Sequence, residues 1–311
     1  MSIIFKTEKE NIDYNSLFNL EDDNYFANIN DFKYAIDNTR YIVFGYEGEK
    51  LVGFARAISE GVETAYIIGA YAKNEDLKYK LIKELEKFLI GKRKMLFANP
   101  KDINLYEELG YLRCKNAYTY INFDINDFNG YFLPAGYKFE TEFYRKPKDK
   151  KIEVKNKEII YKDNINNLDF NKINDLLTKA FFNRPHDINK TKEAFSNSNY
   201  FEAAYDGEKL VGIARAISDG RFSTILNVAV DPDYQGLNIG RKVLLNLSKQ
   251  LSGQIVFLNT HAGSAGFYNR VIEYRRNKTA FEKGPVDRPF SIDSVSEMFL
   301  PKGFRFIDEL D

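Results

Sequence analysis

The chain of 311 residues has no tryptophan, only two histidines and a single cysteine, Cys114. One cysteine excludes an intramolecular disulfide framework. Cys114 lies in an apolar, aromatic stretch, where we expect it to be a small core residue. Because the Cys and His spacing of a metal site is also absent, we expect no bound metal.

Net charge is absent as well, since 45 Lys and Arg balance 45 Asp and Glu. Without a net field to gather a polyanion, we expect no nucleic-acid partner and no attraction to an anionic membrane. No apolar run is long enough to span a bilayer. The N-terminus has no basic segment followed by an apolar run, so we expect a soluble cytoplasmic protein without a secretory signal.

What the sequence does contain is an internal repeat. Residues 48–61 read GEKLVGFARAISEG and residues 207–220 read GEKLVGIARAISDG, so twelve of the fourteen positions are identical at a spacing of 159. Weaker matches extend toward the ends of each copy. We expect two units, residues 1–146 and 152–311, joined by the charged, proline-containing linker 145–151.

The second unit alternates strand-like and helix-like segments, which indicates a mixed α/β layer. A tight-turn signal separates its first two strands, and apolar residues recur at helical spacing after its longest strand. The expected elements are strands over 200–205, 210–218, 222–230 and 255–258, and helices over 239–251 and 265–271.

The two copies differ after the long strand. The second copy continues into Gln235-Gly236-Leu237-Asn238-Ile239-Gly240-Arg241. The first copy reads IIGAYAKNEDLK over residues 67–78 and has no glycine in the place of this loop. A strand end followed by a turn and a helix start gathers unpaired backbone N–H groups, which together with the helix dipole favour a pyrophosphate. Gly236 and Gly240 remove side chains where the backbone must approach a ligand. The dinucleotide and triphosphate glycine patterns are both missing.

This loop resembles the Q/R-x-x-G-x-G/A acyl-CoA loop of the GNAT acetyltransferase superfamily. Val228-Ala229-Val230 resembles the strand before that loop, and Phe267-Tyr268 resembles an aromatic pair on a later helix. Asn238 stands where the family usually has glycine, and Asn accepts the required conformation better than most residues. The resemblance covers nearly the whole chain and implies an α/β (α+β) protein of two tandem GNAT-like domains, each a mostly antiparallel mixed sheet flanked by helices.

The resemblance implies an N-acetyltransferase that moves an acetyl group directly from acetyl-CoA to a primary amine, without a metal. The unit 152–311 would bind acetyl-CoA, and the degenerate unit 1–146 would be non-catalytic and shape or cover the acceptor site. The acceptor, a small molecule or a peptide amine, is not fixed by the sequence. The residues implied to bind the coenzyme are Val228, Ala229, Val230, Gln235, Gly236, Leu237, Asn238, Ile239, Gly240, Arg241 and Phe267.

Tyr268 is the expected general acid. In the family a tyrosine at this place lies near the thioester sulfur and protonates the departing thiolate, and a phenol with a pKa of about 10 is protonated at neutral pH. The first unit keeps Tyr106 in the matching place, so the position also has a structural use. Asn227 stands where many relatives carry a carboxylate, and it would orient the amine or a water rather than accept a proton.

The general base stays open. Glu202, His261 and His186 are candidates, although a scaffold or surface role explains each of them more simply. A chain of waters that carries the proton to solvent is equally compatible with the sequence. The missing carboxylate and Asn238 also leave a second function open, that of a CoA-binding sensor or scaffold without turnover.

Two further features repeat in both units. Arg56 and Arg215 occupy matching places in the repeated hairpin, which predicts a shared role in the fold. Each unit also ends in Phe-Leu-Pro-x-Gly-x-x-Phe, at 132–139 and 299–306. A proline-glycine turn with alternating aromatics predicts one more strand, and an exposed aromatic strand needs a cover. We therefore expect 299–306 to pack as a strand near the boundary between the units.

Overall fold

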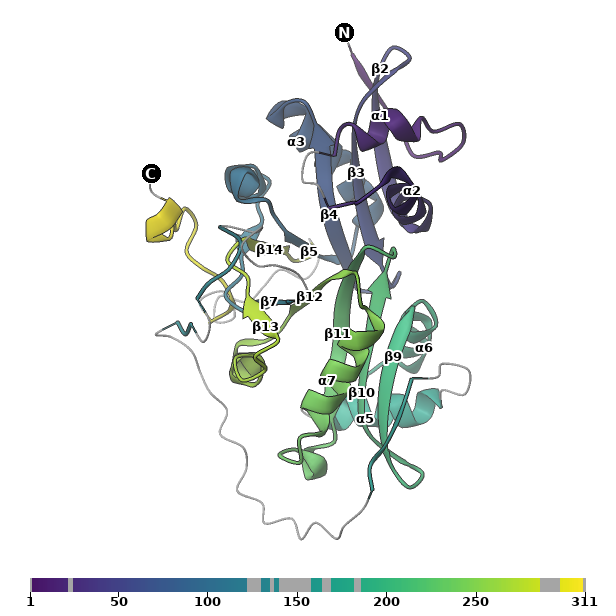
Figure 1. Ribbon diagram of the computed structural model, residues 1–311, viewed down its shortest axis with the longest axis vertical. Coiled ribbons are helices and arrows are strands. Elements are labelled where there is room, and N and C mark those ends of the chain that lie inside the picture. Colours follow the sequence, from purple (N-terminus) through teal and green to yellow (C-terminus); the bar gives the residue numbers. More distant parts are fainter. Residues whose placement is uncertain are drawn as a thin grey trace.

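The computed structural model describes residues 2–21, 25–121, 130–134, 137–139, 158–163, 169–181, 186–285 and 297–309. These residues form two seven-stranded sheets, one above the other along the long axis of the molecule (Figure 1). The expected linker 145–151 lies outside the described residues. Among the described residues, no helix combines the length and the apolar character that a bilayer crossing requires.

The first sheet has the strand order β1-β2-β3-β4-β5-β14-β6, and only the β4–β5 pair is parallel. Its strands are β1 (Ile3–Lys6), β2 (Tyr41–Glu47), β3 (Lys50–Ser59), β4 (Thr64–Ala72), β5 (Arg93–Phe97), β14 (Ala280–Lys283) and β6 (Leu112–Arg113). Two helices pack on one face and two on the other. These are α1 (Tyr14–Phe18) and α2 (Ile29–Asn38), then α3 (Glu75–Glu86) and α4 (Ile103–Glu108).

The second sheet repeats this plan in the order β13-β7-β12-β11-β10-β9-β8, with β11–β12 as its parallel pair. Its strands are β13 (Tyr274–Arg276), β7 (Ala117–Tyr120), β12 (Ile255–Asn259), β11 (Phe222–Val230), β10 (Lys209–Ser218), β9 (Tyr200–Asp206) and β8 (Ile160–Lys162). One face carries α5 (Phe170–Ala180) and α6 (Ile188–Ser196), and the other carries α7 (Ile239–Gln250) and α8 (Ala265–Tyr268). Two mostly antiparallel mixed sheets flanked by helices confirm the expected fold class.

The sequence pattern explains why α7 forms where it does. Its apolar side chains at Ile239, Val243, Leu244 and Leu247 recur every three or four residues and are all buried against the sheet. Burying a leucine or valine side chain contributes about 1.5–3 kcal/mol. This face holds the start of the helix against the end of β11, where the candidate site lies.

The two halves exchange a strand in each direction. β7 from the first half lies between β12 and β13 of the second sheet, where Thr119 pairs with both Phe257 and Arg275. β14 from the second half lies between β5 and β6 of the first sheet, where Phe281 pairs with Leu96 and Arg113. Each sheet therefore contains a strand from the other half, and the exchange joins the halves by main-chain hydrogen bonds.

The repeated tails extend this exchange. Phe299, only 2% exposed, forms a β-bridge with Cys114, and Phe132 forms the matching bridge with Asn277. The expected packing of the tail against the other unit is confirmed, and so is the burial of Cys114. The expected strand over 299–306 is wrong, because the chain leaves the bridge at Pro301, which has no N–H group, and turns at Gly303, where φ is +77°.

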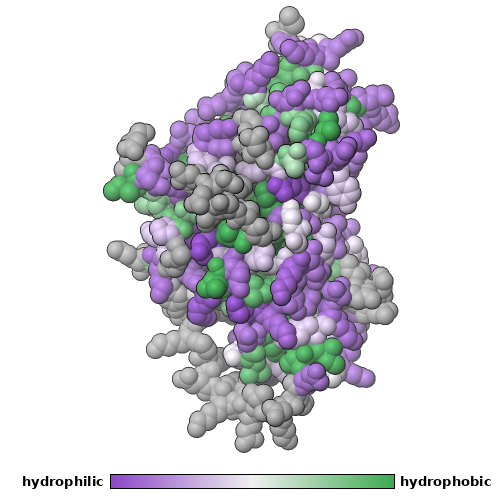
Figure 2. Space-filling model, viewed as in Figure 1, coloured by the Kyte–Doolittle hydropathy of each residue, from purple (hydrophilic) through white to green (hydrophobic). Residues whose placement is uncertain are grey.

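A buried ion pair also connects the halves. Arg56 on β3 donates to the carboxylate of Asp219, just after β10, and both side chains are fully buried. Arg56 also donates to the Thr39 hydroxyl at 3.0 Å, as Arg215 donates to the hydroxyl of the matching Ser198 at 2.9 Å. The expected shared role of the two arginines in the fold is confirmed. The outer face in Figure 2 is mostly hydrophilic, with apolar residues in separate groups.

Candidate functional site

The candidate site begins where β11 and β12 separate. The parallel pairing joins Phe222, Ser223 and Thr224 to residues 255–257 and then stops. Residues 226–230 continue as strand, paired with β10 on the other side, but they have no strand partner toward β12 within the described chain. Unpaired backbone groups in an extended strand are available to hydrogen-bond an extended ligand.

A β-bulge lies in this unpaired stretch, at Asn227. Its φ is +51°, and β11 gains one residue over β10 between Leu226 and Ala229. The Arg215 Nε atom donates to Asn227 Oδ1 at 2.7 Å. Burial lowers the pKa of Arg215 to about 10, so the guanidinium is still charged at neutral pH and holds the bulge in place.

The loop after β11 exposes the start of α7. Gly236 has φ of +88°, and Asn238, the residue before the helix, has φ of +61° in the left-handed region that Asn tolerates. The Asn238 side chain does not cap the helix, and the first turn carries no acidic residue. Among the described residues, the first N–H groups of α7 thus lack a side-chain cap, and the helix itself places no negative charge at the positive end of its dipole.

Gly240 brings three elements together at this point. A Cβ atom at Gly240 would lie 3.2 Å from Val230 Cγ2 and 3.6 Å from the Phe267 ring. The helix start therefore packs closely on the end of β11 and on α8. A glycine-lined helix start without a side-chain cap or a carboxylate has the chemistry that suits a pyrophosphate group. Gln235 is exposed and donates to the Val230 carbonyl at 3.3 Å.

Tyr268 lies on α8, beside a tyrosine from the other half. Its ring is 5.3 Å from the ring of Tyr118 on β7 and 4.9 Å from that of Phe267. Burial raises the pKa of Tyr268, the neighbouring Tyr118 adds to the rise, and a hydrogen bond with Thr260 opposes it. The phenol is therefore protonated across the physiological pH range and is able to donate a proton.

Sequence reasoning missed Tyr118, because it belongs to the other unit. Its hydroxyl accepts a hydrogen bond from Arg276 Nη2 at 2.7 Å and lies 2.9 Å from Asn269 Oδ1, at the end of α8. The ring packs on Tyr268 and is itself buried. The exchanged strand thus supports the short helix that carries the expected acid.

Two candidates for the base are held by helices away from this helix start. Glu202 accepts hydrogen bonds from Asn246 at 2.8 Å and Gln250 at 3.0 Å, in the second half of α7, and burial raises its pKa. The His186 ring lies 6.0 Å from Phe181, next to α5, and its carbonyl accepts from an α5 asparagine. His261 follows β12 and is exposed. These contacts favour a scaffold role for Glu202 and His186.

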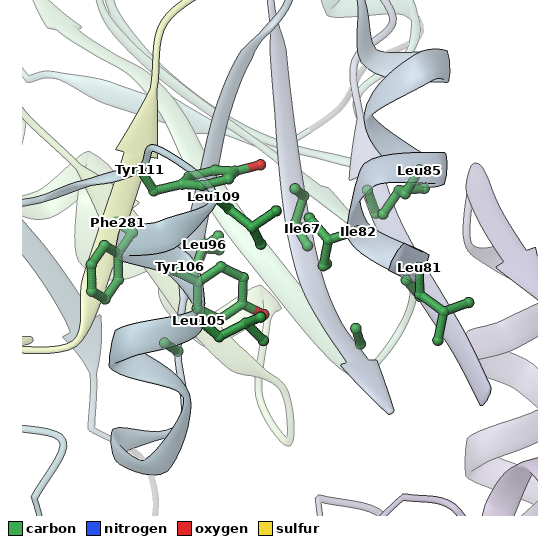
Figure 3. Close-up of a cluster of buried hydrophobic side chains, with 14 of the residues drawn as sticks. Ile67, Leu81, Ile82, Leu85, Leu96, Leu105, Tyr106, Leu109, Tyr111 and Phe281 are labelled. Atoms are coloured by element: carbon green, nitrogen blue, oxygen red, sulfur yellow. The ribbon is translucent and has the colours of Figure 1, made fainter. Parts of the chain in front are cut away.

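Tyr106 shows the structural use of the matching position in the first half. It is buried on α4, and its ring lies 5.9 Å from Tyr111 and 6.0 Å from Phe281 on the exchanged β14. Figure 3 shows Tyr106 in this cluster, with Phe281 on the yellow strand beside the blue elements of the first half. Both halves therefore use this tyrosine to pack α4 or α8 against the exchanged strand.

The match to a family model covers this site. Residues 170–274 match the acetyltransferase (GNAT) family, a stretch that includes β11, the loop, α7 and Tyr268. Residues 170–274 are thus similar to a GNAT acetyltransferase domain. Solved structures that include a tandem GNAT protein share the fold of nearly the whole chain.

Two named relatives match part of the chain. The uncharacterised N-acetyltransferase ycf52 of Porphyra purpurea is 35% identical over 107 residues, which are 32% of this chain and 59% of that protein. The ycf52 protein of Pyropia yezoensis is 36% identical over 106 residues, again 59% of its length. The chain thus spans less than two thirds of the curated relatives that it matches.

Two solved structures share the fold of nearly the whole chain. A candidate acetyltransferase from Pyrococcus horikoshii superposes with a TM-score of 0.51 at 12% identity, over 96% of this chain and 92% of that one. A tandem GNAT protein from the clavulanic acid biosynthesis pathway has a TM-score of 0.50 at 11% identity, over 93% of this chain and 100% of that one. At these identities the likeness concerns the fold alone.

Proposed function

We propose that the protein is an N-acetyltransferase that transfers an acetyl group from acetyl-CoA to a primary amine of a small molecule or a peptide. The observation that carries this proposal is the convergence at Gly240 of an unpaired strand end, an uncapped helix start and the helix of Tyr268. In this proposal residues 152–311, completed by β7, form the catalytic domain, and residues 1–146 are non-catalytic.

The chain offers two groups of contacts for the coenzyme. The N–H groups from Gly236 to Arg241 would hold the pyrophosphate, and the unpaired backbone of Val228, Ala229 and Val230 would pair with the amides of the pantetheine arm. Phe267 packs beside Gly240 and would flank the arm. When bound, the coenzyme supplies an acetyl thioester to the attacking amine.

Tyr268 and Asn227 take the chemical roles. Tyr268 keeps its proton because of burial and would deliver it to the departing thiolate sulfur. Arg215 takes one of the two acceptor positions of the Asn227 side-chain oxygen, so the second would accept a hydrogen bond from the amine, and the amide NH₂ would orient a water. Since neither residue accepts a proton, the proton of the amine would leave through water.

The coenzyme site is tested by Gly240→Glu, with CoA binding measured by calorimetry. A glutamate at this position adds a bulky anion at the helix start, so we expect CoA affinity to fall by at least about 100-fold, since several charge-assisted contacts of about 1.5–3 kcal/mol each are lost. Gly240→Ala separates the steric effect from the charge, and Asp76→Asn, at the matching helix start of the first half, should leave CoA binding unchanged. Unaltered affinity in the glutamate variant would refute the assignment.

A second candidate function is a CoA-binding sensor without turnover. It is favoured by the absence of a carboxylate at Asn227, whose oxygen the structure commits to Arg215. Release of free thiol from acetyl-CoA, measured over a broad panel of amines, separates the two functions. Tight CoA binding without turnover on any amine would support the sensor, whereas turnover that Tyr268→Phe abolishes would eliminate it.

A further inference from the structure

Two hydroxyl groups next to Tyr268 come into place through the strand exchange. Tyr118 lies on β7 of the first half, between β12 and β13 of the second sheet. Thr260 follows β12, and its N–H group donates to the carbonyl of Asn116, just before β7, at 2.9 Å. The positions of both hydroxyls therefore depend on a segment that the first half supplies.

The Tyr118 hydroxyl contacts α8 at both of its ends. It lies 3.2 Å from the carbonyl oxygen of Ala265, the first residue of the helix, and 2.9 Å from Oδ1 of Asn269, just after the last. Arg276 Nη2 donates to the same hydroxyl at 2.7 Å. Among the described residues no side chain caps the start of α8, and a helix of four residues has little stability of its own. These contacts thus hold α8, and with it Tyr268, in place.

Thr260 acts on the phenol itself. Its side chain hydrogen-bonds the Tyr268 hydroxyl and opposes the rise in pKa that burial causes. A hydrogen bond that lowers the pKa of a phenol favours the charged form of that phenol. When Tyr268 gives its proton to the departing thiolate, Thr260 would therefore stabilise the phenolate that remains.

The first half keeps the backbone of this arrangement without either hydroxyl. Phe281 stands in the place of Tyr118, at the same register on the exchanged β14, and Ala98 stands in the place of Thr260. The N–H groups of Ala98 and Thr260 both donate to the exchanged segment at 2.9 Å. Packing and main-chain pairing are thus satisfied without the hydroxyls. Because the two hydroxyls occur in the half that has the uncapped helix start, they point to a role in chemistry rather than in packing.

We propose that Tyr118 and Thr260 are positioning residues for Tyr268: Tyr118 fixes the helix that carries the acid, and Thr260 orients its hydroxyl. This inference rests on the proposed acetyl transfer, and it makes the first half a supplier of part of the active site. No covalent bond forms at either residue. The proton passes from the Tyr268 hydroxyl to the thiolate sulfur, and the phenolate regains a proton from solvent, to which the amine has released its own.

Single variants that copy the first half test the proposal. Tyr118→Phe and Thr260→Ala reproduce Phe281 and Ala98, and each should lower kcat about five- to tenfold, the value of one hydrogen bond. The KM for acetyl-CoA should stay within about twofold, because these contacts act on the transition state and not on coenzyme binding. Thr260→Ser keeps the hydroxyl and should restore kcat. Tyr120→Phe is the matched control, because Tyr120 lies on the same strand and its hydroxyl makes no hydrogen bond among the described residues.

Double variants show whether both residues act through Tyr268. In the Tyr268→Phe background, Tyr118→Phe or Thr260→Ala should change kcat less than about twofold, because the hydroxyl that they position is gone, whereas independent losses would multiply. The assay is thiol release from acetyl-CoA with the amine that the wild-type chain acetylates fastest, alongside melting curves.

The outcomes separate this inference from the proposed function. Multiplied losses, or single variants that melt earlier but keep wild-type kcat while Tyr268→Phe is impaired, would overturn this inference alone. Wild-type kcat in Tyr268→Phe, or no turnover of any amine by the wild-type chain, would overturn the proposed function and this inference with it.

Discussion

The two halves differ most at the start of the helix that follows the long strand. In the second half the eight residues 231–238 separate β11 from α7, which begins uncapped. In the first half only Lys73 and Asn74 separate β4 from α3, and Asn74 together with two carboxylates satisfies the helix start from within the chain. The first sheet therefore keeps the strand order of the second although the connection between its long strand and its helix is six residues shorter.

The clusters of aromatic side chains around Tyr268 and Tyr106, by contrast, are alike in the two halves. Tyr268 packs on Tyr118 and Tyr274, as Tyr106 packs on Phe281 and Tyr111. The chemical difference is the hydroxyl of Tyr118, which Phe281 lacks and which connects Arg276 to α8. Packing preserved the cluster in both halves, so a tyrosine alone does not identify the catalytic half.

The largest expected effect separates these two tyrosines. Tyr268→Phe should lower kcat by about 10²–10⁴-fold, the usual contribution of a positioned acid, because it removes the hydroxyl that the proposed mechanism uses as the proton donor. Tyr106→Phe, the same change in the first half, should alter kcat less than about twofold, because Tyr106 lies on α4, away from the proposed site, and the variant keeps the ring that packs there. Steady-state kinetics with matched melting curves decide the outcome. Equal losses in both variants would mean that the position acts through packing alone.

The next largest expected effect is on stability and concerns the buried Arg56–Asp219 ion pair between the halves. Asp219→Ala leaves Arg56 charged and buried without its partner, so we expect a loss of about 3–5 kcal/mol in unfolding free energy. Glu60 is the matching residue, and its carboxylate accepts only from the backbone of Glu63 and Thr64 within the described contacts. Glu60→Ala should cost about 1–2 kcal/mol. If urea unfolding shows the same loss of unfolding free energy for Asp219→Ala and Glu60→Ala, the ion pair contributes no more to stability than the backbone contacts of Glu60.

A smaller expected difference in stability concerns Phe299 and Phe132, the matching residues of the two repeated tails. Phe299 is 2% exposed and should cost about 3 kcal/mol when changed to alanine, the lower end for a buried phenylalanine. Phe132 forms the matching bridge but is only partly buried, so Phe132→Ala should cost about half as much. Chemical denaturation of the two variants measures the difference. A larger loss for Phe132 would contradict the order of burial.

Local patterns were sufficient to predict most elements and the loop. The helical spacing from Ile239 onward, the turn at Gly207 and the glycines around Asn238 each act over a few residues, so the sequence reports them directly. The left-handed conformation at Asn238 was foreseen for the same reason. The buried place of Cys114 also followed from its neighbours.

The strand exchange did not follow from the sequence. β7 and β14 are four-residue strands at matching places in a repeat, and either could complete its own sheet or the other one with the same alternation of side chains. The residues of so short a strand do not specify which sheet it joins. The position of Tyr118 beside Tyr268 depends on that exchange, which is why it was missed.

The smallest expected effect concerns pH. Burial raises the pKa of Tyr268 above its ordinary value of about 10, so the neutral phenol is favoured at every pH below that value. The acid should therefore not be lost as pH rises from about 7 to 9.5, and kcat should change less than twofold through this residue over that range. The sign for stability is the same: the buried phenol stabilises the fold fully below about pH 10 and loses this contribution only above it. A kcat profile that falls with a midpoint below about pH 9.5 in the wild-type protein, and becomes flat in Tyr268→Phe, would show a lowered pKa and an exposed phenol instead.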